Sequence, residues 1–159
     1  AIELIKNKNI NVIFIGDGRD KTRIQKLISK MGLVKNFSFL GSYPPELMPE
    51  YFSCADVLLI SLKKAKIFSY TIPGKLQSYL ACGKPIIGSL DGIGRKIIMD
   101  SSSGLCSNTE DHLQLSQNIV KLSEMSEEER NIMSRNAIKY FRANFEKEKL
   151  LDRLIEILK

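Results

Sequence analysis

Short apolar runs that alternate with helix-forming segments constrain this chain more than any other feature of its sequence. Residues 12–15, 37–40, 56–61 and 84–88 have the character of buried strands, and a stub of edge strand follows at 105–106. The alternation recurs about every 20 to 25 residues with short loops, which is typical of parallel βαβ units. We therefore predict an α/β fold in which a doubly wound, mostly parallel sheet carries helices on both faces.

Apolar periodicity and helix-stop signals predict the segments between the strands. The first helix should end at Gly32, and its apolar residues should share one face: Ile24, Leu27, Ile28 and Met31. Residues 1–8 are expected to be the end of an earlier helix. We expect a short helix over 46–55, a loop over 63–71, and a turn at 91–94 that leads into a brief helix over 95–99.

Beyond residue 106 the chain is predicted to be all helix. Thr109 is expected to cap one helix. Ser126 and Glu129 form a capping-box signature for the next, over residues 127–144. A final amphipathic helix is predicted from about residue 147 to 159.

Size and composition exclude several classes of protein. A chain of 159 residues, with 43% hydrophobic and 26% charged residues, suits one globular domain with a proper core. No apolar run approaches the roughly 20 residues that span a bilayer, and no signal peptide is visible. Cys54, Cys82 and Cys106 form neither a metal-ligand spacing nor an even disulfide set, which favours a reducing compartment, and we expect a cytoplasmic protein.

The net charge of +6 is unevenly distributed. Residues 57–109 hold seven basic and two acidic residues, whereas residues 110–159 hold nine basic and ten acidic ones. A local positive field fits an anionic ligand, an acidic membrane surface or nucleic acid. We expect no nucleic-acid partner, because no recognisable reading motif accompanies the charge. A basic surface without a specific partner stays an alternative.

The segment that differs most from an ordinary hydrophobic-core sequence is a predicted helix start with the sequence Pro-Gly-Lys. Pro73 suits the first helical turn, and Thr71 is a plausible N-cap whose hydroxyl would reach the N–H of Gly74. The N–H groups of Gly74, Lys75 and Leu76 would then point out of the positive end of the helix, where a phosphate can bind. The plain alternative is a well-capped helix with an exposed lysine.

Glycine-containing turns follow the predicted strands at the edge where ligands of doubly wound sheets bind. The two turns that we single out consist of Gly16, Asp17 and Gly18, and of Gly41, Ser42 and Tyr43. The first lacks the third glycine of a dinucleotide fingerprint, so a tight turn and a ligand contact both fit. The Tyr43 ring would either lie against a base of a ligand or pack against neighbouring side chains of the protein. Residues 91–94 would form either a further ligand-binding loop or an ordinary turn.

Residues for acid–base, nucleophilic or metal catalysis are not recognisable around this edge. His112 is the only histidine, and a surface position is favoured over a catalytic one. No Ser-His-Asp set, metal cluster or paired carboxylate is visible. We predict no catalytic residue, metal or cofactor in this chain.

The order of these motifs resembles the C-terminal, donor-binding domain of retaining nucleotide-sugar glycosyltransferases with the GT-B fold (glycosyl transferases group 1 type). The similarity is nearest to enzymes of bacterial capsule, O-antigen and exopolysaccharide assembly. The matching segments are residues 12–18, 39–44, 55–59 and 71–87, and the pattern continues at 91–92 and 104–105.

The resemblance implies transfer of a sugar from a UDP- or similarly activated donor to a lipid-linked or glycan acceptor. The base and ribose would lie against Gly41 to Tyr43, and the diphosphate on the helix opened by Pro73, Gly74 and Lys75. Residues 1–145 would form a Rossmann-like donor domain whose first strand precedes residue 1. Residues 146–159 would pack on this domain or return to a preceding acceptor-binding domain. The chain alone should transfer nothing, and peripheral association of a full-length protein with the inner face of the cell membrane stays open.

Two positions depart from the family pattern. Many members carry glutamates where this chain has Tyr70 and Ser78, although a subgroup with a similar Thr-Ile-Pro pattern lacks the pair. Ser78 could still hydrogen-bond a ribose hydroxyl, more weakly than a carboxylate would. Two alternatives stay open: a sugar-nucleotide epimerase-like domain, and a non-catalytic interaction module with a flavodoxin-like fold.

Overall fold

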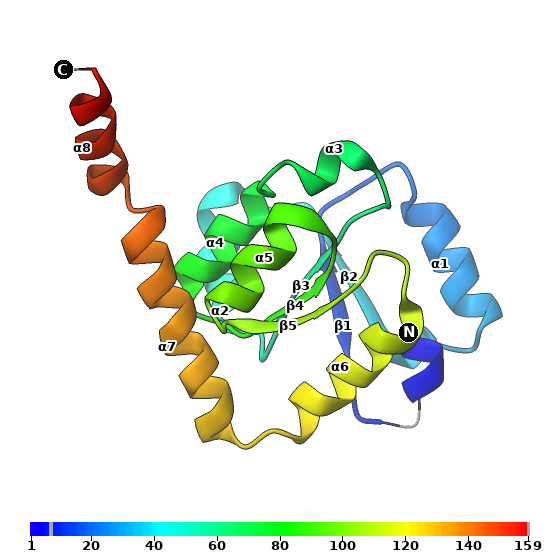
Figure 1. Ribbon diagram of the computed structural model, residues 1–159. Coiled ribbons are helices and arrows are strands. Elements are labelled where there is room, and N and C mark those ends of the chain that lie inside the picture. Colours follow the sequence, from blue (N-terminus) through cyan, green and yellow to red (C-terminus); the bar gives the residue numbers. More distant parts are fainter. Residues whose placement is uncertain (7, 159) are drawn as a thin grey trace. The chain divides into compact units, whose positions relative to one another are not determined.

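The computed structural model describes residues 1–6 and 8–158 (Figure 1). The chain divides into two compact units, Ala1–Pro49 and the part from Glu50 onward. The predicted helix over residues 1–8 and the predicted end of the last helix include residues 7 and 159, which lie outside the described residues. Residues Ile2–Ile5 form a 3-10 helix, η1.

The first unit is built on a parallel pair of strands. Strand β1 (Val12–Ile15) pairs with β2 (Phe37–Gly41), and helix α1 (Lys21–Lys30) connects them. The Phe14 ring stacks on the rings of Phe37 and Phe39, with centroid distances of 6.0 and 5.0 Å. Two short 3-10 helices flank β2: η2 (Val34–Asn36) and η3 (Pro45–Leu47). Both predicted strands are confirmed.

Gly32 terminates α1 as predicted, two positions after the last helical residue, Lys30. Gly32 has a φ of +68°, and its N–H donates to the Ser29 carbonyl at 3.1 Å. The Leu33 N–H donates to the Ile28 carbonyl at 3.0 Å, which completes a Schellman motif with both side chains buried. Leu27 was predicted on the buried face of α1 but is 47% exposed, whereas its neighbour Ile28 is buried. The buried face of α1 therefore covers fewer residues than the apolar pattern of the sequence predicts.

The second unit is built on three parallel strands in the order β3-β4-β5. Their bounds are β3 (Leu58–Ser61), β4 (Ile86–Ser89) and β5 (Gly104–Ser107). The central strand β4 is buried along its whole length, and β5 is the edge strand that its short apolar stub predicts. Every strand pair in the two units is parallel, which confirms the α/β class.

Helices cover both faces of this three-stranded sheet. Figure 1 shows α4 and α5 above the sheet and α6 below it. The helices are α2 (Met48–Ser53), α3 (Lys66–Ser69), α4 (Gly74–Cys82), α5 (Gly92–Asp100), α6 (His112–Glu124), α7 (Glu127–Asn144) and α8 (Lys147–Ile157). No helix within residues 1–6 and 8–158 is long and apolar enough to cross a membrane.

The core lies between the sheet, α4, α5 and α7. Its fully buried side chains include Leu76, Leu80, Ile86, Leu90 and Ile98. Gly83, which ends α4 with a φ of +63°, lets α7 approach, because a Cβ at this glycine would lie 2.5 Å from the Ile138 Cδ1 atom. Gly83 therefore both ends α4 and makes room for the packing of α7.

Several local predictions in this unit were wrong. The predicted loop over 63–71 contains α3, a single turn too short to show helical periodicity. The predicted turn at 91–94 is instead the first turn of α5, which begins at Gly92. The predicted helix over 46–55 is shorter, because α2 begins at Met48 after the 3-10 turn η3.

The cap of α6 was also predicted wrongly. Asp111 is the N-cap, and its carboxylate accepts a hydrogen bond from the Gln114 N–H at 2.9 Å. Thr109, two residues earlier, is too far from the first helical turn to cap it. The Thr109 hydroxyl is buried and has no hydrogen-bond partner in the described part of the chain.

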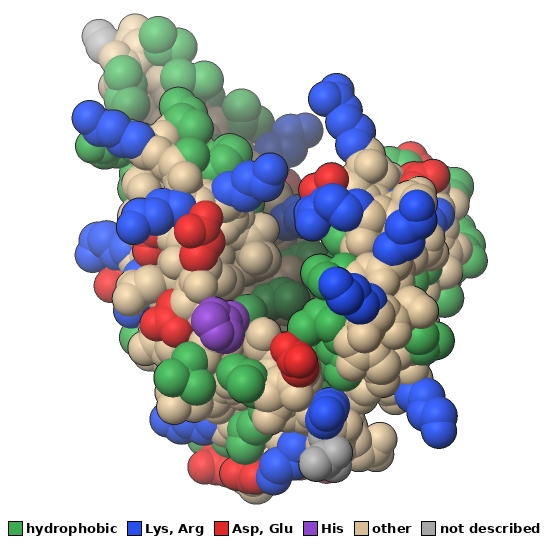
Figure 2. All heavy atoms as spheres, turned by 90° about the vertical axis from the view of Figure 1, so that its right-hand side faces the viewer, with side chains coloured by type: hydrophobic (Ala, Val, Ile, Leu, Met, Phe, Trp, Pro, Cys, Tyr) green, Lys and Arg blue, Asp and Glu red, His purple; other side chains and the backbone are tan. Residues whose placement is uncertain are grey.

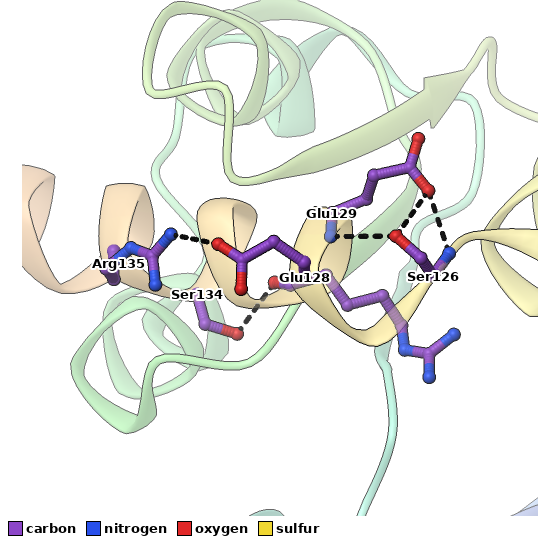
Figure 3. A network of polar contacts seen from close by, with 6 residues as sticks. Ser126, Glu128, Glu129, Ser134 and Arg135 are labelled. Carbon is purple, nitrogen blue, oxygen red and sulfur yellow. Dashed lines mark hydrogen bonds and ion pairs between the residues drawn. The ribbon is translucent and has the colours of Figure 1, made fainter.

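The capping box at the start of α7 is confirmed (Figure 3). The Ser126 hydroxyl accepts from the Glu129 N–H at 3.2 Å, and the Glu129 carboxylate accepts from the Ser126 N–H at 2.8 Å. These hydrogen bonds from Ser126 lower the pKa of Glu129. The reciprocal bonds fix the start of α7 at the residue that the sequence pattern indicates.

Candidate functional site

The carboxyl ends of β3, β4 and β5 present a row of serines. Ser61 pairs with Ser89 across β3 and β4, and Ser89 pairs with Ser107 across β4 and β5. Ser89 and Ser107 are buried, and the Ser107 hydroxyl donates to the Gly88 carbonyl at 3.4 Å. Sequence reasoning missed this row, although each of these strands ends in serine. The row marks the sheet edge at which ligands of parallel α/β folds bind.

Helix α4 begins at this edge in a different way from the prediction. Pro73 is the N-cap, with φ −61° and ψ 129°, and does not lie inside the first turn. Thr71 does not cap α4, because its hydroxyl donates instead to the Ile67 carbonyl at 3.3 Å. The Leu76 N–H donates to the Pro73 carbonyl at 2.9 Å, so it is not available to a ligand. Two of the three predicted donors, on Gly74 and Lys75, lack a hydrogen-bond partner among residues 1–6 and 8–158.

The space in front of α4 is open. A Cβ placed on Gly74 would meet no heavy atom within 4 Å. Lys75 is exposed, and no carboxylate of the described chain lies within ion-pair distance of it. Two N–H groups at the positive end of the helix dipole and one ammonium therefore face solvent together. Such a helix start can bind a phosphate group.

Two glycines of α5 let it pack closely on the residues that precede α4. A Cβ on Gly92 would lie 2.0 Å from the Ser69 carbonyl oxygen, and a Cβ on Gly94 would lie 3.2 Å from the Pro73 Cδ atom. Gly92 also has a φ of +68°, which favours glycine. From the sequence, either a ligand loop or an ordinary turn was expected at residues 91–94. The structure gives both glycines a packing role that positions the start of α4.

Side-chain hydrogen bonds join the loops at this edge. The Asp91 carboxylate accepts from the Thr109 N–H at 3.3 Å, and Arg95 donates to the Asn108 side-chain oxygen at 2.6 Å. The Glu110 carboxylate accepts from the Lys64 N–H at 3.4 Å. The loops that follow β3, β4 and β5 therefore support one another, which keeps the edge preformed.

The two glycine turns of the first unit contact each other directly. The Gly16 N–H donates to the Gly41 carbonyl at 2.6 Å, and both glycines have positive φ angles, of +121° and +80°. The Asp17 carboxylate accepts from the Gly18 N–H at 3.1 Å and pairs with Lys21 at 3.4 Å. No heavy atom lies within 4 Å of a Cβ at Gly16, Gly18 or Gly41. That these turns share a ligand with α4 stays a prediction.

Three further candidate residues, and Tyr70 at the position of a family glutamate, are exposed. Ser42 follows Gly41 at the surface, and Tyr43 is 40% exposed. Ser78 is exposed on the second turn of α4, and Tyr70 is 65% exposed after α3. Figure 2 shows Lys and Arg side chains that project into solvent on the side that it draws. Because Ser42, Tyr43, Tyr70 and Ser78 are exposed, burial does not prevent them from contacting a ligand.

Groups suited to covalent or metal chemistry do not gather here. His112 is exposed at the start of α6, in agreement with a surface position. Burial raises the pKa of Cys82 and raises that of Cys106 to about 11, so neither thiol is activated. Within the described residues, no group of three or more His, Cys, Asp or Glu side chains could hold a metal ion. The site offers anion binding by backbone N–H groups and lysine.

The amino-acid sequence was compared with models of known protein families. Residues 1–140 match the model of the family Glycosyl transferases group 1. No curated protein sequence matches the chain.

Solved structures share the fold. The Anabaena protein Alr3699/HepE in complex with UDP is 17% identical, with a TM-score of 0.83 over 98% of this chain and 43% of that one. A glycosyltransferase from Rickettsia africae is 16% identical, with a TM-score of 0.82 over 98% of this chain and 41% of that one. The C-terminal domain of the group 1 protein LpcC from Francisella tularensis is 17% identical, with a TM-score of 0.73 over 92% of this chain and 76% of that one. The chain thus spans less than half the length of the first two proteins.

Proposed function

Because this chain belongs to the glycosyl transferases group 1 family and has the fold of a GT-B C-terminal domain, we propose that it binds the donor of a retaining glycosyltransferase. The proposed donor is a UDP-sugar, and the proposed acceptor is lipid-linked or a polysaccharide. Structures of the similar Anabaena protein contain UDP and UDP-glucose, which supports the choice of donor. The observation that carries the proposal is the open amino end of α4, where the N–H groups of Gly74 and Lys75 have no hydrogen-bond partner in the described part of the chain.

The proposed role of this helix end is to hold the donor diphosphate. Negative charge grows on the departing diphosphate as the bond to the sugar breaks. The N–H groups of Gly74 and Lys75 and the Lys75 ammonium would stabilise that charge. Leu76, one of the residues predicted to bind, would contribute through packing only, because its N–H is bonded to Pro73 and its side chain is fully buried.

The proposed place for the nucleoside is the pair of turns in the first unit. Gly16, Gly18 and Gly41 leave open space where a ribose could approach the backbone. The Tyr43 ring offers a flat face to a base. Ser78, in place of the glutamate that many family members carry, would give a neutral hydrogen bond to a sugar hydroxyl.

The proposed whole protein is longer than this chain. Since the chain spans 43% of the HepE chain, we place the acceptor-binding domain in the remainder of a full-length protein. The chain alone should bind the nucleotide weakly and transfer no sugar, because it carries no recognisable acid, base or acceptor site. Closure of the two domains around the donor would complete the site.

A nucleotide titration tests the proposal. The chain is titrated with UDP and, separately, with GDP while its backbone amide signals are followed by NMR. We expect shifts at Gly74 and Lys75 and around Gly41, and stronger binding of UDP. Absence of shifts at both places would refute the site.

A pair of lysine variants tests the role of the ammonium. Lys75→Ala should weaken UDP binding roughly 10- to 150-fold, because a hydrogen bond to a charged group is worth about 1.5 to 3 kcal/mol. The control is Lys121→Ala, which removes an exposed lysine of α6 and should leave UDP affinity unchanged. Equal affinities of the two variants would show that Lys75 does not contact the diphosphate.

A further inference from the structure

The loop that joins β5 to α6, residues 108–111, reaches across the end of the central strand, and we call it the crossing loop. The strand order is β3-β4-β5, so β4 lies between the other two strands. The Glu110 carboxylate nevertheless accepts from the Lys64 N–H, in the loop after β3, at 3.4 Å. Because neighbouring strands lie about 4.8 Å apart, this contact bridges roughly 10 Å of the sheet edge. The Ser89 hydroxyl of β4 donates to the Asn108 carbonyl at 3.5 Å, so the crossing loop covers the end of that strand.

The crossing loop is anchored on the helices at its two sides. The Asn108 side-chain oxygen accepts from Arg95 of α5 at 2.6 Å, and the Thr109 N–H donates to the Asp91 carboxylate, just before α5, at 3.3 Å. The Asn108 N–H donates to the side-chain oxygen of Gln114 in α6 at 3.2 Å. The base of the crossing loop is therefore fixed on α5 and on α6.

Glu110 adopts a backbone conformation that favours glycine. Its φ is +66°, and Ser102 is the one other non-glycine residue with a positive φ among residues 1–6 and 8–158. A residue with a Cβ pays a cost in free energy for this conformation, which persists only where the surrounding contacts impose it. Residues of this kind cluster at ligand-binding and catalytic sites. The shape of the crossing loop is therefore set by its contacts and not by the local preference of Glu110.

The loop that Glu110 holds belongs to the connection between β3 and α4, residues 62–73. This connection is fixed at its start, where the Leu62 N–H donates to the Ser89 carbonyl at 3.0 Å. It is fixed again near its end, where the Ser69 backbone packs against α5. The hydrogen bond to Glu110 lies between these two points and holds the part of the connection that precedes α3. The crossing loop therefore acts on the residues that lead to the amino end of α4.

We propose that Glu110 is a positioning residue of the donor site. Its hydrogen bond to the Lys64 N–H keeps the connection in the arrangement that leaves the amino end of α4 open to a diphosphate, and this inference rests on the proposed function. Without the bond, a smaller fraction of the molecules has that arrangement, and the affinity falls with this fraction. The carboxylate acts as a hydrogen-bond acceptor, because its negative charge, next to exposed Lys63, Lys64 and Lys66, would by itself weaken the attraction for an anion.

Amide hydrogen exchange of the chain without nucleotide tests the hydrogen bond itself. The Lys64 amide should exchange about fivefold faster in Glu110→Ala than in the wild type, which is the ratio that one hydrogen bond of typical net strength supports. Glu110→Gln, which retains an acceptor oxygen, should exchange like the wild type. Equal exchange of the Lys64 amide in Glu110→Ala and the wild type would overturn the proposal, whether or not the chain binds a nucleotide.

A UDP titration tests the consequence for the donor site. The control is Glu156→Ala, which removes an exposed carboxylate of α8 and changes the net charge equally. Glu110→Ala should bind UDP about fivefold more weakly than this control, and Glu110→Gln should bind like it. Equal affinities of Glu110→Ala and the control, or equally weak binding by Glu110→Gln, would refute the positioning role alone. A wild-type chain that does not bind UDP would refute the proposed function, and the positioning role with it.

Replacement by glycine separates positioning from stability. Glu110→Gly removes the carboxylate and also the cost of the left-handed conformation, so its urea midpoint should be higher than that of Glu110→Ala. Its UDP affinity should nevertheless be no higher than that of Glu110→Ala, because both variants lack the acceptor for the Lys64 N–H. If the glycine variant regained the affinity of the wild type together with its stability, Glu110 would act on the fold as a whole and the proposal would fail.

Discussion

Replacement of Gly92 by alanine should destabilise the second unit by several kcal/mol. The added Cβ would lie 2.0, 2.4 and 2.5 Å from the carbonyl oxygen, Cα and carbonyl carbon of Ser69. All three are backbone atoms, so no side-chain rotation can relieve the overlap. Either α5 or α3 must move by about 1 Å, which resembles overpacking of a core and costs about 1 to 3 kcal/mol.

A second cost comes from the backbone conformation of Gly92. Its φ of +68° is left-handed, and a residue with a Cβ adopts this conformation at a cost of about 1 to 2 kcal/mol. The two costs together predict a loss of about 2 to 5 kcal/mol. For a chain of this size, 1 kcal/mol corresponds to about 2 to 4 °C in Tm, so the predicted decrease is roughly 10 °C.

Urea unfolding followed by circular dichroism measures the effect. The control is Gly74→Ala, which makes the same chemical change in the first turn of α4, where φ is ordinary and the Cβ meets nothing within 4 Å. That variant should be as stable as the wild type or slightly more stable. A Gly92→Ala free energy of unfolding within about 0.5 kcal/mol of the wild type would show that close packing of α5 on Ser69 is not required.

Two further predictions concern the capping box and the thiols. Ser126→Ala should cost about 1 kcal/mol in urea unfolding at neutral pH. Because hydrogen bonds lower the folded pKa of Glu129, its contribution is present above the unfolded pKa and is lost as the pH falls, so the gap between the variant and the wild type should narrow in acid. Ellman's reagent should modify exposed Cys54 first, partly buried Cys82 more slowly, and buried Cys106, whose pKa is about 11, only after unfolding. A stable Ser126→Ala variant, or fast labelling that disappears in Cys106→Ser, would contradict these expectations.

Strands and strongly signalled helix ends could be predicted from the sequence. The run at 12–15 forms β1, and the Ser126 and Glu129 pair gives α7 the predicted bounds. Both signals are local: a strand's apolar run and a capping box each lie within a few residues. Gly32 and Gly83 were predictable for the same reason, since a left-handed residue at a helix end favours glycine.

The wrong predictions have two causes: a contact distant in sequence at Gly92, and a competing local hydrogen bond at Thr71. Gly92 and Gly94 look like a turn, yet they lie in the first turn of α5, where a Cβ on Gly92 would overlap the Ser69 backbone and a Cβ on Gly94 would lie 2.5 Å from the Leu90 Cδ1 atom. Thr71 looks like a cap, yet its hydroxyl bonds back to Ile67, because α3 places that carbonyl within reach. The Ser69 contact cannot be identified from local sequence spacing, whereas the Ile67 carbonyl lies only four residues before Thr71.

At the candidate site, too, some features could be predicted from the sequence and others depend on the tertiary structure. The sequence by itself determined that a Pro-Gly-Lys helix start follows a buried strand in a parallel α/β fold, since residue type and apolar periodicity carry that information. Only the tertiary structure decided that two N–H groups, on Gly74 and Lys75, remain available, and that Gly92 and Gly94 hold the preceding residues. The reason is physical: which donors remain unpaired, and where a Cβ cannot fit, depends on backbone atoms that only the fold brings together.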